Sequence, residues 1–392
     1  MGGTEEGTRL AERVDIREYF EDLEDPRNGP AQMHELIDIV VIAICAIVCG
    51  ADHWTEVEAF GQAREAWLRQ FLELPHGIPS HDTFSRVFRY LNPAAFESGF
   101  RAWTQALHNR TAGEVIPIDG KCLRGSHDRA TEKAAIYMVS AWAENNHLVL
   151  GQRKVDEKSN EITAIPELLR VLDVKDCIVT IDAMGTQKEI AAQIREQEGD
   201  YLLALKGNHS HLSEDADSLF KWAKKTDYLG LDHDYHRTIN KGHDRIEIRE
   251  CWTLSGVASL SVLSGQQDWA GLQTVARIRS ERRHNGDITS DERFYISSLP
   301  YAGQHTATQV LHAARSHWGI ENRLHWVLDM AFHEDECRVR LGHGDENLAI
   351  LRHIALNLLR ADKHTRLGVH GKRLKAAWDL DYLSEILGFQ MR

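Results

Sequence analysis

The sequence predicts an α/β fold in which a mixed sheet is flanked by helices, preceded by a helical domain and interrupted by a β-rich insertion. Three observations support this class. Apolar residues recur at helical spacing in the first third of the chain, short apolar runs then alternate with helical patterns, and a stretch of alternating runs precedes further helices. The predicted domains are 1–112, 113–210, 211–304 and 305–392.

Length and composition predict an ordinary water-soluble protein. The 392 residues suffice for two or three domains, with 42% apolar and 27% charged residues. The six cysteines form no C-x-x-C pair, which favours reduced core residues in a cytosolic protein. The first residues are acidic, unlike a secretion signal, and the apolar stretch Ile39 to Ala51 is too short to span a bilayer. We expect a cytoplasmic protein without a membrane partner.

The charge of −13 argues at first sight against binding nucleic acid, because DNA is bound by lysine and arginine. The charge is uneven, however. No lysine precedes Lys121, whereas the tail from Arg352 to Lys375 is rich in basic residues. A metal site also needs local carboxylates. The net charge therefore does not exclude a DNA-binding face.

The region 1–112 is predicted to be helical and is a candidate for DNA binding. Ser80 is a predicted N-cap for a helix whose apolar residues, from Phe84 to Leu91, follow helical spacing. The opposite face of this helix carries Arg86 and Arg89, which could lie on DNA. A surface helix with two solvated arginines is the simpler interpretation, and both stay open here.

From 113 to 210 the pattern is three strands, a helix, a strand, a helix and a strand. This is the order of a ribonuclease-H-like sheet, with helices on both faces. Pro117 is awkward in a central strand because it lacks an amide donor. The predicted elements are strands 115–118, 135–143, 148–155, 177–181 and 201–205, and helices 162–172 and 186–197.

The segment 211–304 carries alternating runs near 244–252, 273–279 and 293–298, which predict a β-rich insertion into this core. Helical patterns resume near Thr306 and continue to Met330, and again over 344–359. The region 305–392 is therefore predicted to complete the core and to end in a basic helical tail.

Two aspartates end neighbouring predicted strands. Asp119 follows the run 115–118, and Asp182 follows the run 177–181. Ligands of α/β sheets gather at the carboxyl ends of strands, so both carboxylates should face one crevice. With Glu321 from a later helix, they could hold two Mg²⁺ (or Mn²⁺) ions for phosphoryl transfer. The alternative is that each aspartate is a turn residue or, for Asp182, a helix N-cap.

The third carboxylate is not fixed by pattern alone. Asp329 and Glu334 compete with Glu321, and His325 lies four residues beyond it on one helical face. The histidines 317, 325 and 333 are eight residues apart and have no zinc-binding companion motif. We interpret them as groups that support the site or contact phosphate.

Cationic and polar residues near the predicted strand ends are candidates for binding the phosphates that flank a scissile bond. Salt bridges to the carboxylates are the alternative role. The candidates are Lys121 and Arg124 after the first aspartate, Lys206 and Asn208 after the fifth strand, and Arg245 in the insertion. Trp252 could stack on an unpaired base, although a strand tryptophan is more often a core residue.

Several motifs, in the right order, resemble the H-repeat-associated branch of bacterial insertion-sequence transposases, the DDE type with a ribonuclease-H-like core. The similarity extends from about Tyr19 to Leu359. It rests on Gly77–Phe84, Ile118–Lys121 with Arg124–Ser126, Asp182–Gln187, Leu205–Asn208, Gly242–His243 with Arg245–Glu247, and His317–Asn322 with Leu324–Trp326 and Leu328–Asp329.

The resemblance implies that Asp119, Asp182 and Glu321 are the catalytic and metal-binding triad. In related proteins an arginine lies four residues before the glutamate and a lysine seven after it; here these positions hold His317 and Leu328. We therefore consider His317, Arg315, Arg323 and His325 as candidate DNA contacts around the glutamate.

The resemblance predicts a bacterial DNA transposase, located with the nucleoid, that cuts element ends and joins them to target DNA. Its partners would be double-stranded terminal inverted repeats and target DNA, bound by a homodimer because two ends are joined. Two alternatives remain open. The first is a non-mobile metal-dependent endonuclease of the same fold, and the second is an inactive DNA-binding relic.

Overall fold

The computed structural model describes residues 14–28, 32–108, 111–127, 135–155, 161–242 and 245–389. The chain divides into two compact units. Unit 1 contains the described residues of 1–109, 123–135 and 327–392, and unit 2 contains those of 110–122 and 136–326. The domain boundaries predicted at residues 112, 210 and 304 stay a prediction.

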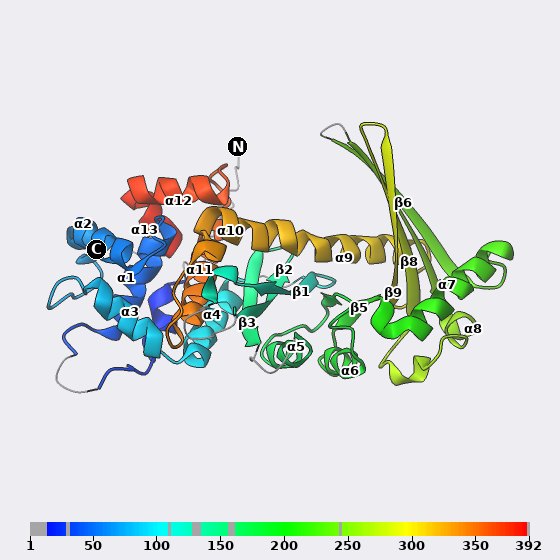
Figure 1. The fold of residues 1–392 in the computed structure, drawn as a ribbon, viewed down its shortest axis with the longest axis horizontal. Helices are drawn as coiled ribbons and strands as arrows, with labels where there is room; N and C mark the ends of the chain where they lie inside the picture. The colour runs from blue at the N-terminus through cyan, green and yellow to red at the C-terminus, as the bar shows by residue number, and fades with distance from the viewer. Residues whose placement is uncertain are drawn as a thin grey trace, which may run out of the picture. The chain divides into compact units, whose positions relative to one another are not determined.

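Unit 1 is helical (Figure 1). Its first segment contributes one short 3₁₀ helix, Ile16–Tyr19, and four α-helices, and its last segment contributes most of α10, all of α11 to α13, and a 3₁₀ turn at Glu334–Glu336. The α-helices are α1 (Leu36–Val48), α2 (Trp54–Leu68), α3 (His81–Tyr90), α4 (Pro93–Leu107), α10 (Trp326–Phe332), α11 (Gly344–Ala361), α12 (Val369–Trp378) and α13 (Leu380–Leu387).

The centre of unit 1 is formed by α1 and α11, which pack against each other. Nearly every residue of α1 is buried, as expected for a helix that is apolar on all sides. Helix α11 also contacts α3, α4 and α12. The apolar stretch beginning at Ile39 is therefore a buried helix, as predicted. Among the described residues, no helix is long and apolar enough to cross a membrane.

The basic tail is only partly a solvent-exposed surface. Arg352, Lys372 and Arg373 are buried in unit 1. Lys372 Nζ donates to the carbonyls of Leu359 and Asp362, at 2.9 and 2.6 Å, near the end of α11. These three cations of the predicted basic tail thus belong to the core of unit 1.

Unit 2 is built on one nine-stranded sheet with the order β3-β2-β1-β4-β5-β9-β8-β7-β6. Strands β1, β4 and β5 are parallel, and β2 and β3 are antiparallel to their neighbours. The first five strands therefore form the predicted ribonuclease-H-like arrangement. They are β1 (Val115–Cys122), β2 (Tyr137–Ala143), β3 (Leu148–Val155), β4 (Ile178–Ile181) and β5 (Asp200–Leu205).

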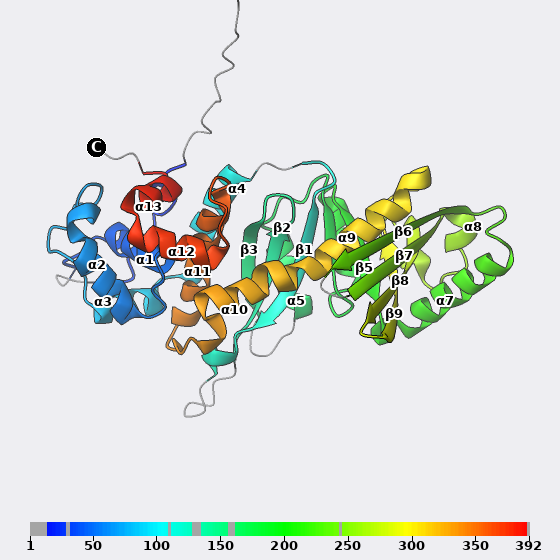
Figure 2. The same ribbon diagram turned by 90° about the horizontal axis from the view of Figure 1, so that it is seen from above.

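Helices cover both faces of this sheet (Figures 1 and 2). Helices α5 (Glu161–Leu169) and α6 (Lys188–Glu196) lie on one face with α7 (Ser210–Lys225), and α9 (Thr306–Ile320) crosses the other. Alternating residues of the strands fill the two layers, since successive side chains of a strand point to opposite faces. Ile116 and Ile118 belong to the α5–α6 core, whereas Val115 packs with α9.

Pro117 occupies the centre of β1 without breaking the sheet. It pairs with Thr180 in the parallel ladder to β4, and the antiparallel ladder to β2 starts only at Ile118. The missing amide of Pro117 therefore does not remove a ladder hydrogen bond to β2. This resolves the conflict that the sequence pattern raised.

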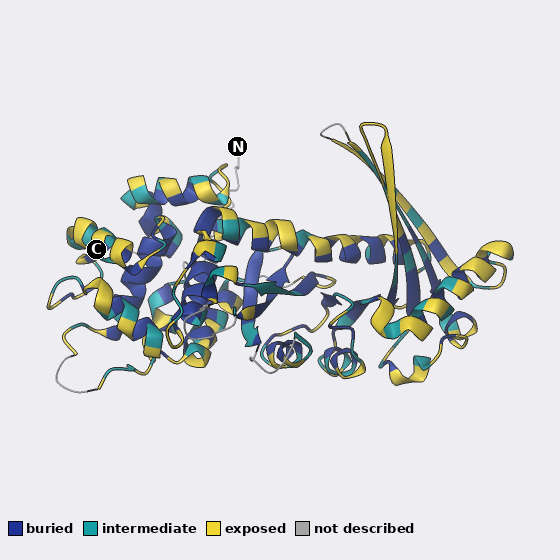
Figure 3. Ribbon diagram, viewed as in Figure 1, coloured by how far each residue is buried: buried dark blue, intermediate teal, exposed yellow. Residues whose placement is uncertain are grey.

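The insertion is β-rich, as predicted, and it extends the core sheet because β9 pairs antiparallel with β5. The parts of the insertion that lie far from the core strands are exposed to solvent (Figure 3). Helix α7 and strand β6 were not predicted from the sequence. The elements are β6 (Asp232–Gly242), β7 (Arg245–Ser255), the short helix α8 (Gly256–Leu260), β8 (Thr274–His284) and β9 (Asp287–Ser297).

Candidate active site

The candidate site lies within unit 2, where β1, β4, α5 and the segment after α9 come together. Asp119 is the first residue of β1 beyond its ladder with β4, which ends at the pair of Ile118 and Ile181. Asp182 immediately follows β4. The two aspartates therefore lie at adjacent points of the central strands, but only Asp182 ends its strand as predicted, because β1 continues past Asp119 to Cys122 in its ladder with β2.

Asp119, Glu321 and His325 form the tightest group. One ligand atom from each lies within 4.8 Å of the others. The His325 Nδ1 atom is 3.6 Å from an oxygen of Asp119 and 3.6 Å from an oxygen of Glu321. The competing carboxylates Asp329 and Glu334 belong to unit 1. Geometry within unit 2 therefore favours Glu321 as the helical carboxylate.

The environment of Asp119 is strongly acidic. Burial, with the nearby charges of Glu321, Glu161 and Asp182, raises the pKa of Asp119 to about 7, although a hydrogen bond from the Gly120 amide opposes the shift. Carboxylates placed this close repel one another, and burial disfavours the charged form. A divalent cation would relieve both costs, so the donor set fits an oxygen-preferring ion such as Mg²⁺ or Mn²⁺.

Asp182 lies outside the tight group but near enough to act on it electrostatically. Its charge contributes to raising the pKa values of Asp119 and Glu161. One Asp182 oxygen accepts hydrogen bonds from the amides of Met184 and Gly185, at 3.0 and 3.1 Å. The turn role considered as an alternative is therefore real. The two turn hydrogen bonds occupy Asp182 Oδ1, so Oδ2 would be the main oxygen available to bind a metal ion.

Glu161 is a fourth carboxylate of this site, and sequence patterns did not indicate it. It opens α5, and burial together with the charge of Asp182 raises its pKa, whereas a hydrogen bond with Tyr137 opposes the shift. A Cβ atom at position 120 would lie 2.2 Å from Glu161 Oε1. Glycine at position 120 thus makes room for the carboxylate beside Asp119.

His317 is buried beneath the site. Only 7% of the residue is exposed, and its Nδ1 lies 3.2 Å from Thr180 Oγ1 of β4. Burial lowers the pKa of His317 to about 4, although the charge of Asp182 opposes the shift. A neutral, enclosed imidazole is poorly placed to bind phosphate. The geometry therefore does not favour the DNA contact that we predicted for it.

The loop after β5 is tied to the loop that carries Asp182. Asn208 Nδ2 donates to the carbonyl of Ala183 at 2.5 Å, and His209 Nε2 is 2.7 Å from the carbonyl of Thr186. Lys206 is exposed at the start of this loop. Lys121 lies two residues after Asp119 on β1, and therefore on the same face of the strand.

The remaining predicted DNA contacts are dispersed. Arg245 pairs with Glu247 at 3.0 Å on β7, next to His243 and Asp244, which lie outside the described residues. Trp252 packs against the core, with the Arg277 guanidinium 4.4 Å from its ring centroid.

Three of the residues predicted to contact DNA belong to unit 1. Arg124 is exposed, and its Nε lies 3.7 Å from Asp335. Arg86 is exposed on α3, and the Arg89 guanidinium lies 5.2 Å from the ring centroid of Tyr90. These placements leave the role of α3 as a DNA-binding helix a prediction.

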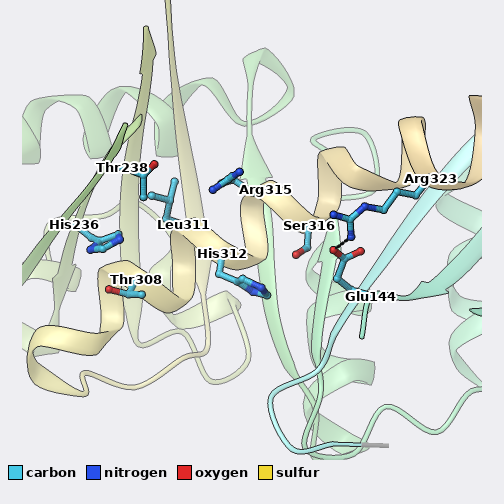
Figure 4. A pocket seen from close by; sticks show the side chains of 9 residues that line it. All are labelled: Glu144, His236, Thr238, Thr308, Leu311, His312, Arg315, Ser316 and Arg323. Carbon is cyan, nitrogen blue, oxygen red and sulfur yellow. Dashed lines mark hydrogen bonds and ion pairs between the residues drawn. The ribbon is translucent and has the colours of Figure 1, made fainter. Parts of the chain in front are cut away.

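Two pockets flank α9 and are rich in arginine. One, of about 340 Å³, is lined by Glu144, His236, His312 and others shown in Figure 4. The second, of about 500 Å³, is lined by Arg249 and Arg293 of the insertion and by Trp318 of α9. Arg315 and Arg323 line both pockets.

Comparison with known proteins identifies a family for nearly the whole chain. The family described as "Transposase DDE domain" matches residues 110–358, and "DDE_Tnp_1-associated" matches residues 17–104. The relative "Putative transposase YncI" of Escherichia coli O157:H7 is 41% identical over 95% of this chain and 94% of its own. "H repeat-associated putative transposase YhhI" of Escherichia coli K12 is 38% identical over 95% of this chain and 97% of its own.

A further relative, "Inactive transposase YbfQ" of Escherichia coli K12, is 36% identical but covers only 18% of this chain. The cryo-EM structure of the piggyBac transposase synaptic complex with hairpin DNA aligns with 97% of this chain and 82% of its own, at 10% identity and a TM-score of 0.43, which is too low to support an inference. The family match and the full-length relatives decide the assignment: this chain belongs to the DDE transposase family, and its relatives include the H-repeat-associated proteins.

Proposed function

We propose that this protein cuts the ends of an insertion sequence and joins them to target DNA by metal-dependent phosphoryl transfer. The observation that carries the proposal is the convergence of Asp119 and Glu321, about two hundred residues apart in the chain, on one group with His325. Asp182 and Glu161 border the same group. This arrangement supports the triad of Asp119, Asp182 and Glu321.

The triad would hold two divalent cations, Mg²⁺ or Mn²⁺. When bound, such ions generate a nucleophile at neutral pH and stabilise charge on the phosphate oxygens. Asp119 is half-buried on β1 and would fix the position of the scissile phosphate relative to the sheet. Glu321 is exposed and approaches from the helix, so it would close the site from the opposite side.

Metal chelation tests the proposal in its simplest form. DNA carrying candidate terminal repeats should be nicked by the protein in Mg²⁺, and EDTA should abolish nicking while leaving end binding intact. Pre-nicked ends should then be joined to a second DNA. Nicking that persists in EDTA would contradict the metal-dependent mechanism, and nicking without joining would favour the non-mobile endonuclease.

DNA is proposed to approach along α9, where the two pockets meet. The Arg315 side chain is exposed and makes no hydrogen bond or ion pair with the part of the chain that the structure describes. Arginines whose donors are not satisfied within the protein suit phosphate oxygens. We propose double-stranded DNA bound here by a homodimer.

Arg315→Ala should weaken binding to all DNA sequences about equally, because phosphate contacts carry no sequence information. The slope of log affinity against log salt concentration should fall by about 1, the expected value for one lost phosphate contact. Fluorescence anisotropy at several salt concentrations measures the DNA affinity and its salt dependence. Lys221→Ala, on α7, is the matched exposed control because Lys221 is paired with Asp217. An unchanged salt slope for Arg315→Ala would show that Arg315 does not contact a DNA phosphate.

Glu161→Gln should slow Mg²⁺-dependent nicking roughly 10–100-fold, the usual effect of losing a group that supports a metal site. The uncharged amide cannot support a cation and no longer repels Asp119. End binding should be unchanged. Single-turnover nicking on saturating DNA measures the rate, with Glu189→Gln as an exposed control on α6. Equal rates for both variants would show that Glu161 has no part in the reaction.

A further inference from the structure

The glutamate of the candidate triad sits on an irregular turn. Residues Glu321–His325 form a π-helical turn between α9 and α10. Such a turn contains one extra residue, and it is commonly found as a single turn at functional sites. The extra residue rotates the following side chains by about 100° relative to a continuous α-helix. The orientations of Glu321 and His325 toward Asp119 therefore depend on this turn.

Packing at the two ends of the turn is unequal. Leu324 and His325 are buried, whereas the Glu321 side chain is 59% exposed. Close packing therefore does not fix the glutamate. Packing anchors the end of the turn at Leu324 and His325, and an interaction closer to Glu321 would add to this anchor.

Arg323, in the middle of the turn, forms an ion pair with Glu144 (Figure 4). The Glu144 side chain is 9% exposed and directly follows β2. The other Glu144 oxygen accepts a hydrogen bond from Trp142 Nε1 at 3.2 Å, and Trp142 is fully buried. The ion pair thus connects the irregular turn to the rigid core of the sheet.

Burial of the Glu144 carboxylate makes this pair selective for its geometry. A buried carboxylate is unfavourable without a charged or hydrogen-bonding partner, so Glu144 strongly favours the arrangement that keeps Arg323 in place. We propose that Arg323 is a positioning residue: its ion pair with Glu144 fixes the π-helical turn and thereby places Glu321 and His325 beside Asp119. This inference rests on the proposed function, and it replaces the direct DNA contact first predicted for Arg323.

The positioning role and the DNA-contact role of Arg323 predict different nicking rates for Glu144→Gln. If Arg323 positions the turn, this variant should nick saturating DNA roughly 10–100-fold more slowly than wild type with unchanged DNA affinity. If Arg323 contacts DNA, releasing it from Glu144 should leave the rate unchanged and leave or strengthen the affinity. Arg323→Lys retains the ion pair and should recover most of the rate that Arg323→Gln loses. Asp217→Asn, which breaks the exposed ion pair between Asp217 and Lys221 on α7, is the control.

Mn²⁺ affinity separates failure of this inference from failure of the proposed function. Glu144→Gln and Arg323→Gln should each bind Mn²⁺ at least several-fold more weakly than wild type in calorimetric titrations, even if no nicking is detected for any variant. Melting temperatures would show whether Glu144→Gln folds, and Arg323→Gln, whose side chain is 46% exposed, serves in its place if it does not. Wild-type rates and Mn²⁺ affinity in the folded variants, or a loss of DNA affinity alone in Arg323→Gln, would overturn the proposal.

Discussion

Asp119→Asn is expected to reduce Mg²⁺-dependent nicking by roughly 10³-fold or more while end binding survives. The Asp119 side chain is 19% exposed, against 59% for Glu321, and three other acidic side chains raise its pKa. The amide preserves the size of the side chain but removes the charge that a cation requires. Single-turnover nicking and anisotropy on the same DNA measure the two properties separately.

The control for this variant is Glu189→Gln, which removes one negative charge from the exposed first turn of α6. It should nick at the wild-type rate. An Asp119→Asn protein that nicks as fast as this control would show that Asp119 is not a catalytic residue. Loss of end binding in Asp119→Asn would point instead to a folding defect, which circular dichroism detects.

The largest effect on stability is expected for Arg373→Met in unit 1. Arg373 is buried and donates to the carbonyls of Ile47, Ala51 and Ala331, and it pairs with Asp52 at 3.4 Å. The substitution would leave these carbonyls and the Asp52 carboxylate without their donor. Removing one partner of a buried pair costs about 3–5 kcal/mol.

Such a loss should lower the melting temperature of unit 1 by roughly 10 °C, as expected for a region of this size. Differential scanning calorimetry measures it. Arg366→Met is the control, because Arg366 is exposed and shows no ion pair in the described part of the chain. A similar melting temperature for both variants would contradict the structural role of Arg373.

Short apolar runs were sufficient to predict the core sheet and to place Asp182 at the end of β4, although β1 extends beyond the predicted end at Ile118 to Cys122. Short apolar runs bounded by turns are a strong local signal, and parallel strands bring their carboxyl ends to one edge. Glu161 carries no comparable signal, since acidic residues are common in the first turn of any helix. Only the fold brings Glu161 against Gly120.

The sequence already contained a signal that His317 is buried, but the resemblance to related proteins outweighed it. It lies four residues after Ala313 and three before Ile320, both buried, so helical spacing already placed it on the inner face of α9. The comparison with an arginine at this position in related proteins favoured an exposed role instead. Burial against Thr180 gives His317 a packing role in the structure and does not favour a contact with DNA.

The missed elements of the insertion have different causes. Strand β6 is polar along most of its length and forms by pairing with β7, so tertiary context overrides its weak strand propensity. Helix α7 does show helical spacing, with Leu212, Ala216, Leu219 and Phe220 on its buried face. Its prediction failed because the whole segment was interpreted as strands.

Counting bound ions tests the central claim most directly. Electron paramagnetic resonance titration of Mn²⁺ into the complex of the full chain with end DNA should show two ions per wild-type protomer. Folded Asp119→Asn, Asp182→Asn and Glu321→Gln should each lose at least one of them. Wild-type stoichiometry and affinity in all three variants would contradict the account, because the cations would then be held elsewhere.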